Sequence, residues 1–254
     1  MLETGEKLTS PPARHYAHPP VVEALAEVYF VGSVWDATVP GRFYDRICDR
    51  FPDISSQVEL QVGGPNPTDP PETRERVQFR SPGADRIVQV AKDLLVVNRL
   101  RPYSSFEDWI GDTSEMLAVY RELARPTGFS RVGVRYINRI PVESEGIELS
   151  RYFRIYPEVP DELGSPFGPF LLRVETTPPG RPAHRMVTTF GTSETDEHEP
   201  ALLLDLYDIV SAQDNPGLER LMGLISEGHE NVVVAFENAI TDAVRARFGQ
   251  EGAG

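Results

Sequence analysis

The sequence predicts an α+β protein in which two duplicated β-α-β-β-β-α units share a curved, mainly antiparallel sheet packed on two long helices. Strand-like and helix-like segments follow the same order twice along the chain. Proline clusters at residues 11–20, 65–71, 157–169 and 178–182 separate these segments, and no strand or helix should cross them. The letters of the two halves differ, so the evidence for duplication is the order of the elements.

The first half, residues 20–127, begins with VVEALAEVYF at residues 21–30, a strand by its alternation of apolar residues. A short helix follows, with Pro40 in its first turn. The segments SQVELQV, RVQFRS, RIVQVA and LLVVNRLR indicate strands joined by turns that contain Gly or Asp. Ser105 is a suitable N-cap for a long helix through FEDWIGDTSEMLAVYRELA, which Pro126 ends.

The second half, residues 128–250, begins with RVGVRYINRIPV, which also alternates like a strand. A short helix around ELSRYF precedes three predicted strands, PFLLRVETT, RMVTTFGT and ALLLDLYDIV. A long helix is expected from about Gly217 to Phe248, with an apolar stripe at helical spacing. The stripe consists of Leu218, Met222, Ile225, Val232, Val233, Phe236, Ile240 and Val244.

In each half a long helix covers one face of the sheet, which leaves the other face to solvent, a partner or the second half. We expect the two halves to form one structural unit. Residues 1–19 are expected to be a flexible N-terminal arm that carries His15 and His18. These two histidines would suit a shared metal ion, or they are incidental to the arm. We predict no metal site.

Composition indicates an ordinary globular protein, with 40% hydrophobic residues in 254. No run approaches the length of a membrane span, and the first residues lack an apolar signal core. The single cysteine, Cys48, cannot form an internal disulfide, which fits a reducing cytoplasm. The net charge is −14, and residues 191–254 hold thirteen Asp or Glu against three Arg. This charge argues against nucleic acid as a partner.

A row of arginines stands out in this acidic chain. Arg131, Arg135 and Arg139 follow one another at a spacing of four, so one face of the predicted strand carries all three. The first strand of the other half carries Glu23 and Glu27 on the face opposite its apolar row. If the two first strands are neighbours, each glutamate–arginine pair would contribute roughly 0.2–1 kcal/mol.

The arginine row has a second interpretation, a polar face that binds a ligand. Bidentate guanidinium groups suit carboxylates and phosphates. The cations that could join this face are Arg99, Arg101, Arg173 and Arg185.

Several blocks resemble a sporadically distributed bacterial family of about this length. They are PPVVEALAEVYF, NRLRPYSSFEDW, VGVRYINRI, LLLDLYDIV and FENAITDAVRARF, and they cover almost the whole chain in order. The PPxxEAxxE and RYxNRI patterns are the most specific. The family has no established activity, cofactor or catalytic residue, so the resemblance implies a single family unit and no mechanism. Patchy distribution suggests an accessory gene of a mobile-element or defence locus.

Catalytic signatures such as G-x-S-x-G, a P-loop or H-E-x-x-H do not occur, and no cofactor is predicted. His229 falls on the apolar stripe of the last helix, where it is either a hydrogen-bonded core residue or part of a small polar site with Asn138. Asn98 holds an equivalent place in the first half. The acidic run at residues 193–200 is either a cation site or a solvated loop.

The sequence favours a non-catalytic, cytoplasmic binding or regulatory protein that recognises a protein or a small anionic ligand through its arginine-bearing sheet face. The alternative is an enzyme of unrecognised class, with Glu27, Arg135 and His229 around one pocket. The candidate ligand-binding residues are Arg131, Arg135, Arg139, Asn138, Glu27, Arg99, Arg101 and His229.

Overall fold

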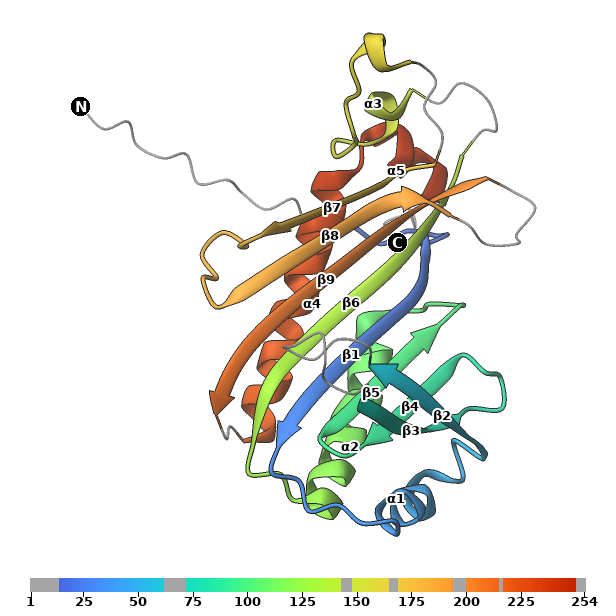
Figure 1. The fold of residues 1–254 in the computed structure, drawn as a ribbon. Helices are drawn as coiled ribbons and strands as arrows, with labels where there is room; N and C mark the ends of the chain where they lie inside the picture. The colour runs from blue at the N-terminus through green and yellow to red at the C-terminus, as the bar shows by residue number, and fades with distance from the viewer. Residues whose placement is uncertain are drawn as a thin grey trace.

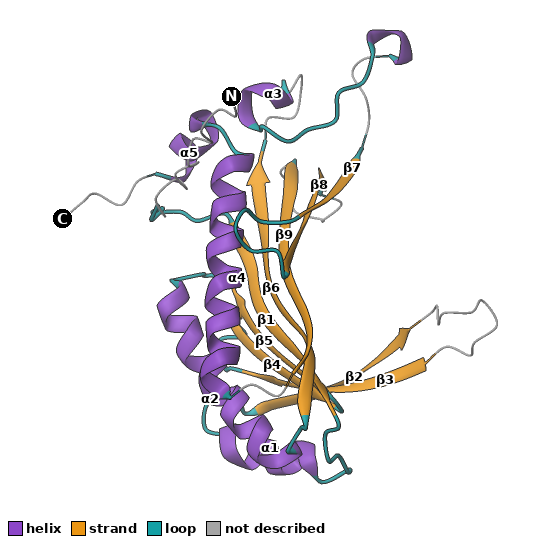
Figure 2. Cartoon of the chain, turned by 90° about the vertical axis from the view of Figure 1, so that its left-hand side faces the viewer, coloured by secondary structure: helices purple, strands orange, loops and turns teal. Residues whose placement is uncertain are grey.

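The computed structural model describes residues 14–61, 72–142, 148–164, 169–193, 200–214 and 217–249. In this part of the chain nine strands form one sheet, with the helices along one side of it (Figures 1 and 2). The strands are β1 (Val21–Val31), β2 (Asp53–Gln61), β3 (Glu72–Arg80), β4 (Arg86–Ala91), β5 (Leu94–Leu100), β6 (Gly128–Pro141), β7 (Leu171–Thr176), β8 (His184–Thr192) and β9 (Ala201–Asp214). The helices are α1 (Val39–Ile47), α2 (Phe106–Ala124), α3 (Leu149–Tyr152), α4 (Leu218–Ala239) and α5 (Asp242–Phe248), with a 3-10 turn at Asp161–Leu163.

The predicted α+β class and the large, curved antiparallel sheet are confirmed (Figure 2). The strand order is β2-β3-β4-β5-β1-β6-β9-β8-β7, and every neighbouring pair is antiparallel. The first strands of the two halves, β1 and β6, pair with each other at the centre, as expected. Each also pairs with the last strand of its own half, β5 or β9. Four strands follow α1, which agrees with the four strand-like segments named in the first half and exceeds by one the number in the predicted repeat unit.

Side-chain alternation separates the two faces of the central strands. On β1, Ala24, Ala26 and Val28 are buried toward the helices, whereas the residues between them are half-buried on the other face. On β6, Val134 and Tyr136 are likewise buried beneath the helices. We call the face toward α2 and α4 the covered face and the opposite one, toward which β2 and β3 project, the open face (Figure 2).

Helix α2 begins and ends as the sequence predicts. The Ser105 hydroxyl accepts a hydrogen bond from the Asp108 amide at 3.2 Å, which satisfies one of the free N–H groups of the first turn. The helix ends at Arg125, which has a left-handed φ of 43° and precedes Pro126. Trp109 and Tyr120 are at most 1% exposed and fill the layer between α2 and the sheet.

The predicted long C-terminal helix is in fact two helices, α4 and α5. Ile240 between them is extended and forms an isolated β-bridge with Phe153, next to α3. The Thr241 amide donates to the Tyr152 carbonyl at 3.0 Å, outside the helix. At Ile240 and Thr241, hydrogen bonds to the α3 segment therefore replace the hydrogen bonds of a continuous helix. Helical periodicity could not reveal this break, because the competing partners lie about 90 residues earlier in the chain.

We predict that Gly133→Ala lowers the free energy of unfolding by about 1–3 kcal/mol, because the site has no room for a methyl group. A Cβ atom there would lie 2.6 Å from the Tyr207 ring and 3.0 Å from Cγ of Glu27. Urea denaturation measures the change. The control is Gly111→Ala in α2, where a Cβ meets nothing within 4 Å and stability should rise by about 0.5–1 kcal/mol. Equal stabilities for the two variants would contradict the close packing at Gly133.

Candidate functional site

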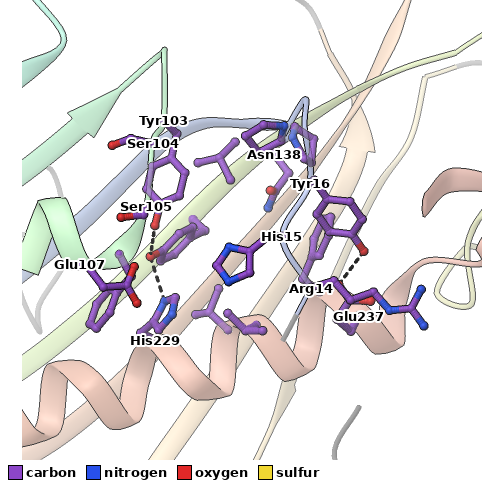
Figure 3. Close-up of a pocket in the computed structure, with 18 residues that line it drawn as sticks. Arg14, His15, Tyr16, Tyr103, Ser104, Ser105, Glu107, Asn138, His229 and Glu237 are labelled. Atoms are coloured by element: carbon purple, nitrogen blue, oxygen red, sulfur yellow. Dashed lines mark hydrogen bonds between the residues drawn. The ribbon is translucent and has the colours of Figure 1, made fainter. Parts of the chain in front are cut away.

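A cavity of about 230 Å³ lies on the covered face, beside the middle of α4 (Figure 3). Its walls come from four parts of the chain that are far apart in sequence. Strand β6 contributes Tyr136 and Asn138, and α4 contributes His229. The segment that leads into α2 contributes Tyr103 and the first turn of that helix. The fourth wall is formed by residues 14–21, which precede and begin β1.

Local structure explains why these side chains converge. Tyr136 and Asn138 lie two apart on β6, so both point to the covered face. His229 follows the fully buried Ile225 by one helical turn, which directs its ring toward the sheet. The N-cap at Ser105 starts α2 beside the cavity and brings Phe106 against His229. The two rings stack with centroids 3.9 Å apart and planes within 2°.

The cavity contains a chain of three hydrogen-bonded groups (Figure 3). The hydroxyls of Tyr103 and Tyr136 lie 2.9 Å apart, and the Tyr136 hydroxyl lies 2.9 Å from Nδ1 of His229. One interpretation of the sequence placed His229 and Asn138 together in a small polar site. In the structure these two side chains are not hydrogen-bonded to each other. Asn138 instead donates to the backbone carbonyl of Leu204 on β9 at 3.1 Å, although it lines the same cavity.

Burial keeps all three groups of this chain uncharged near neutral pH. Desolvation lowers the pKa of His229 to about 4, and the carboxylate of Glu107 opposes this shift only in part. Burial also raises the pKa of Tyr103 to about 12 and that of Tyr136 well above its ordinary value. The site therefore offers neutral donors and acceptors.

Residues 14–19, expected to belong to a flexible arm, pack against the C-terminal helices. The Tyr16 hydroxyl donates to Glu237 on α4 at 2.6 Å, and its ring meets the edge of Phe248 with centroids 5.4 Å apart. The backbone amide of His18 donates to the Phe248 carbonyl at 2.9 Å. Glu237 is only 2% exposed and is neutralised by Arg245 at 2.8 Å. The N-terminal wall is thus fixed to α4 and α5.

The arginine row lies on the open face, so the sheet separates it from the cavity. Arg131 lies 3.1 Å from the Glu27 carboxylate and 3.8 Å above the Tyr29 ring. Arg135 donates two hydrogen bonds to Asp205 on β9, at 2.8 and 2.5 Å. A glutamate–arginine contact between the two first strands does form, but it joins Glu27 to Arg131, whereas we expected Arg135 or Arg139 to be the partner. The sequence did not predict Asp205 as the partner of Arg135.

The remaining candidate residues are dispersed. Arg139 is only 6% exposed on β6. Arg99 bonds Asp85 at 2.8 Å, and Arg101 is exposed in the segment before α2. Asn98 donates to Glu23 on the open face at 2.6 Å.

The structure does not gather the predicted residues into one site. Arg173 and Arg185 share Glu175 at the β7 edge of the sheet, at 2.9 and 3.1 Å. Arg135 and His229, expected around one pocket, lie on opposite faces of the sheet. The acidic run at residues 194–199 lies outside the described residues.

A second polar cluster lies beneath α4 and was missed in the sequence. Nδ1 of His184 on β8 lies 2.7 Å from Asp208 on β9, and Nε2 lies 3.1 Å from Glu227 on α4. The amide of Asn231 donates to Asp208 at 2.9 Å. Burial raises the pKa of Asp208, although its hydrogen bonds to His184 and Asn231 oppose the shift. A cavity of about 280 Å³ adjoins the cluster.

The sequence did contain a signal for this cluster. In ALLLDLYDIV, Asp208 occupies the same alternating face as Leu204, Leu206 and Val210, so strand periodicity places a carboxylate in the core. A buried carboxylate needs partners. The identity of those partners, from β8 and α4, depends on the tertiary fold.

No protein-family model and no curated protein matches this chain. Among the described residues, no helix combines the length and the apolar character that a membrane span requires. The same residues contain no group of three or more His, Cys, Asp or Glu side chains suited to hold a metal ion. The geometry of the cavity is therefore the main basis for a functional proposal.

We predict that His229 makes stability depend on pH between about 4 and 6.5. Its folded pKa, about 4, lies below its ordinary value of 6.5, so the unfolded chain binds the proton more readily. The contribution is complete above pH 6.5 and is lost as pH falls toward 4, a change of about 3 kcal/mol. Urea denaturation at several pH values measures it, and His229→Gln should flatten the profile over this range. His18→Gln, an exposed residue, is the control. Parallel profiles for wild type and His229→Gln would refute the assignment.

We also predict that two aspartates on β9 differ in their effect on stability. Asp208→Ala leaves the buried His184 and Asn231 without their carboxylate partner and should lower the free energy of unfolding by about 3–5 kcal/mol. Asp205→Ala removes the partner of Arg135, whose side chain is 40% exposed, and should cost about 1 kcal/mol or less. Denaturant midpoints of the two variants test this order. Similar losses would contradict the burial of the His184 cluster.

Proposed function

We propose that this protein is a non-catalytic binding or regulatory protein and that it binds a small, ring-containing molecule in the cavity beside His229. The observation that carries the proposal is the convergence of two tyrosine hydroxyls and an imidazole on one cavity walled by aromatic and aliphatic side chains. Binding sites typically combine such apolar walls with a few placed polar groups.

Cavity size supports a ligand built on one ring. An apolar cavity of roughly 150 Å³ is enough to bind benzene. A volume of about 230 Å³ accommodates a single ring with a few substituents. Phe106 and Phe236 offer apolar wall area, and the hydroxyl and imidazole groups orient the ring within it.

The arginine-bearing face is our second candidate, as a site for a protein or a small anionic ligand. It is favoured by exposure, since the side chains of Arg131 and Arg135 are 35% and 40% exposed on the open face. An anion there would have to displace Glu27 or Asp205 from guanidinium groups that they already bind. That competition makes this face the weaker candidate.

An enzyme remains the alternative class, with His229 or the His184–Asp208 pair as the acid–base group. We further propose a cytoplasmic location, supported by the single free thiol of Cys48. A role in a mobile-element or defence locus is a proposal supported by the sequence resemblance alone.

We infer that the two halves of the sheet arose by duplication. The support is the strand order, in which each half places its first strand beside its last strand and the two first strands pair. The extra strand of the first half and the division of the last helix are differences between the copies. If the inference is correct, the cavity belongs to the interface between the copies, because it uses residues from both.

We predict that a subset of small ring compounds raises the melting temperature of the wild-type protein and that His229→Gln reduces this shift. The change removes the imidazole at the cavity wall, whereas the matched change Arg135→Gln alters the open face on the same region of the sheet. Differential scanning fluorimetry with a panel of aromatic, heterocyclic and carboxylate compounds provides the measurement. Arg135→Gln should leave the shift unchanged.

Three results would change the proposal. Loss of the shift in Arg135→Gln, with His229→Gln unaffected, would transfer binding to the arginine-bearing face. Turnover of any compound that disappears in His229→Gln would establish an enzyme. No shift with any compound would contradict small-molecule binding in the cavity.

A further inference from the structure

The hydrogen-bonded chain in the cavity restricts which ligands can complete it. Tyr136 lies in the middle, between the Tyr103 hydroxyl and Nδ1 of His229, at 2.9 Å from each. Within the described part of the chain, no other protein group is hydrogen-bonded to the Tyr103 hydroxyl or to Nε2 of His229. Both end residues line the cavity, and we infer that a ligand there contacts the two ends of the chain.

A count of hydrogens shows what these two ends present. Each tyrosine hydroxyl carries one hydrogen, and a neutral imidazole carries one. Two of these three hydrogens are used inside the chain, which leaves one to donate outward. If Tyr103 donates to Tyr136 and Tyr136 to His229, the outward donor is Nε2–H of His229 and the Tyr103 oxygen accepts. If every bond is reversed, Tyr103 donates outward and Nε2 accepts.

In both of these arrangements the chain presents one donor at one end and one acceptor at the other. A third arrangement, in which Tyr136 accepts both bonds, is disfavoured because its buried hydroxyl hydrogen would have no acceptor among the described residues. The count holds as long as His229 is neutral, and its burial against Phe106 keeps it so near neutral pH. A simple carboxylate ligand, which only accepts, would satisfy one end and leave the other without a partner. The charged groups of the cavity wall do not decide this point, because Glu107 disfavours an anion and Arg14 favours one.

We propose that the ligand is an uncharged ring that carries both a hydrogen-bond donor and an acceptor, the chemistry of cyclic amides and pyrimidinone-type heterocycles. This inference rests on the proposed binding function of the cavity and specifies its ligand. The ring packs against the aromatic and aliphatic walls, and its polar edge completes the chain at both ends. Either direction of the chain serves, so the site tolerates tautomers of the ligand.

Three matched probes test this chemistry by isothermal titration calorimetry with the full-length protein. Uracil is uncharged and has donors and acceptors, 1,3-dimethyluracil keeps the ring and carbonyls but has no donor, and orotate adds a carboxylate. We expect uracil to bind about 10-fold or more tightly than 1,3-dimethyluracil, the effect of one unsatisfied buried polar group. We also expect it to bind more tightly than orotate, whose carboxylate would lose hydration in the cavity.

Tyr136→Phe breaks the chain at its centre and keeps the ring. The preference for uracil over 1,3-dimethyluracil should then fall to near unity, and His229→Gln serves as a second variant if Tyr136→Phe does not fold. The matched control is Tyr44→Phe on α1, which removes a hydroxyl that donates to the Pro52 carbonyl and should keep the preference.

The outcomes separate this inference from the proposed function. Equal binding of the three probes, or tightest binding of 1,3-dimethyluracil, overturns the donor-and-acceptor rule while the cavity remains a binding site. Tightest binding of orotate overturns the requirement that the ligand be uncharged. A uracil preference that survives in Tyr136→Phe also overturns it. If none of the three probes binds, the inference fails, and the fluorimetry panel decides separately whether the cavity binds any ring compound.

Discussion

The antiparallel pairing of β1 with β6 is the contact on which the rest of the structure depends. It joins the two halves of the chain into one sheet, and its register places Leu25 opposite Arg135 and Ala24 opposite Tyr136. Because side chains alternate, this register assigns each residue of the central strands to one face. A slip of one residue would exchange the faces and bury the arginines beneath the helices.

The two faces use polar residues in different ways. On the open face, Arg135 and Asp205 form a bidentate pair in contact with water, where such pairs add little to stability. On the covered face, the His184–Asp208 pair and the Tyr103–Tyr136–His229 chain are surrounded by the core, where each polar group needs a partner. The groups with the larger energetic consequences therefore lie under α4, away from the arginines that dominate the sequence.

The cavity also depends on the two ends of the described chain. The break at Ile240 lets α5 lie against α3, and α5 in turn receives the backbone of the segment around Tyr16. Arg245 on α5 neutralises Glu237, which binds the Tyr16 hydroxyl. The N-terminal wall of the cavity thus rests on the helix that the break creates. The N-terminal wall and the division of the last helix therefore both depend on the packing of α5.

Local patterns in the sequence determined the elements and their exposed or buried faces. The alternation in β1 and β6, the Ser105 cap and the stretch through Ala124 all act within a few residues, so they can be recognised without the fold. The central pairing of β1 and β6 followed from the repeated order of elements. His229 was correctly placed on an inward helical stripe by its spacing from Ile225.

Only the tertiary structure decided which of these residues meet. Tyr103, Tyr136 and His229 come from three separate parts of the chain. Periodicity predicts which face of an element a residue occupies, but it does not predict which residue of another element it contacts. The same holds for Asp205 with Arg135 and for His184 with Asp208. It also holds for Ile240, which the sequence places in a helix but which is extended in the structure because it forms a β-bridge with Phe153. Hydrogen bonds and ion pairs act over about 3 Å, so they depend on the position of chain segments that are distant in sequence.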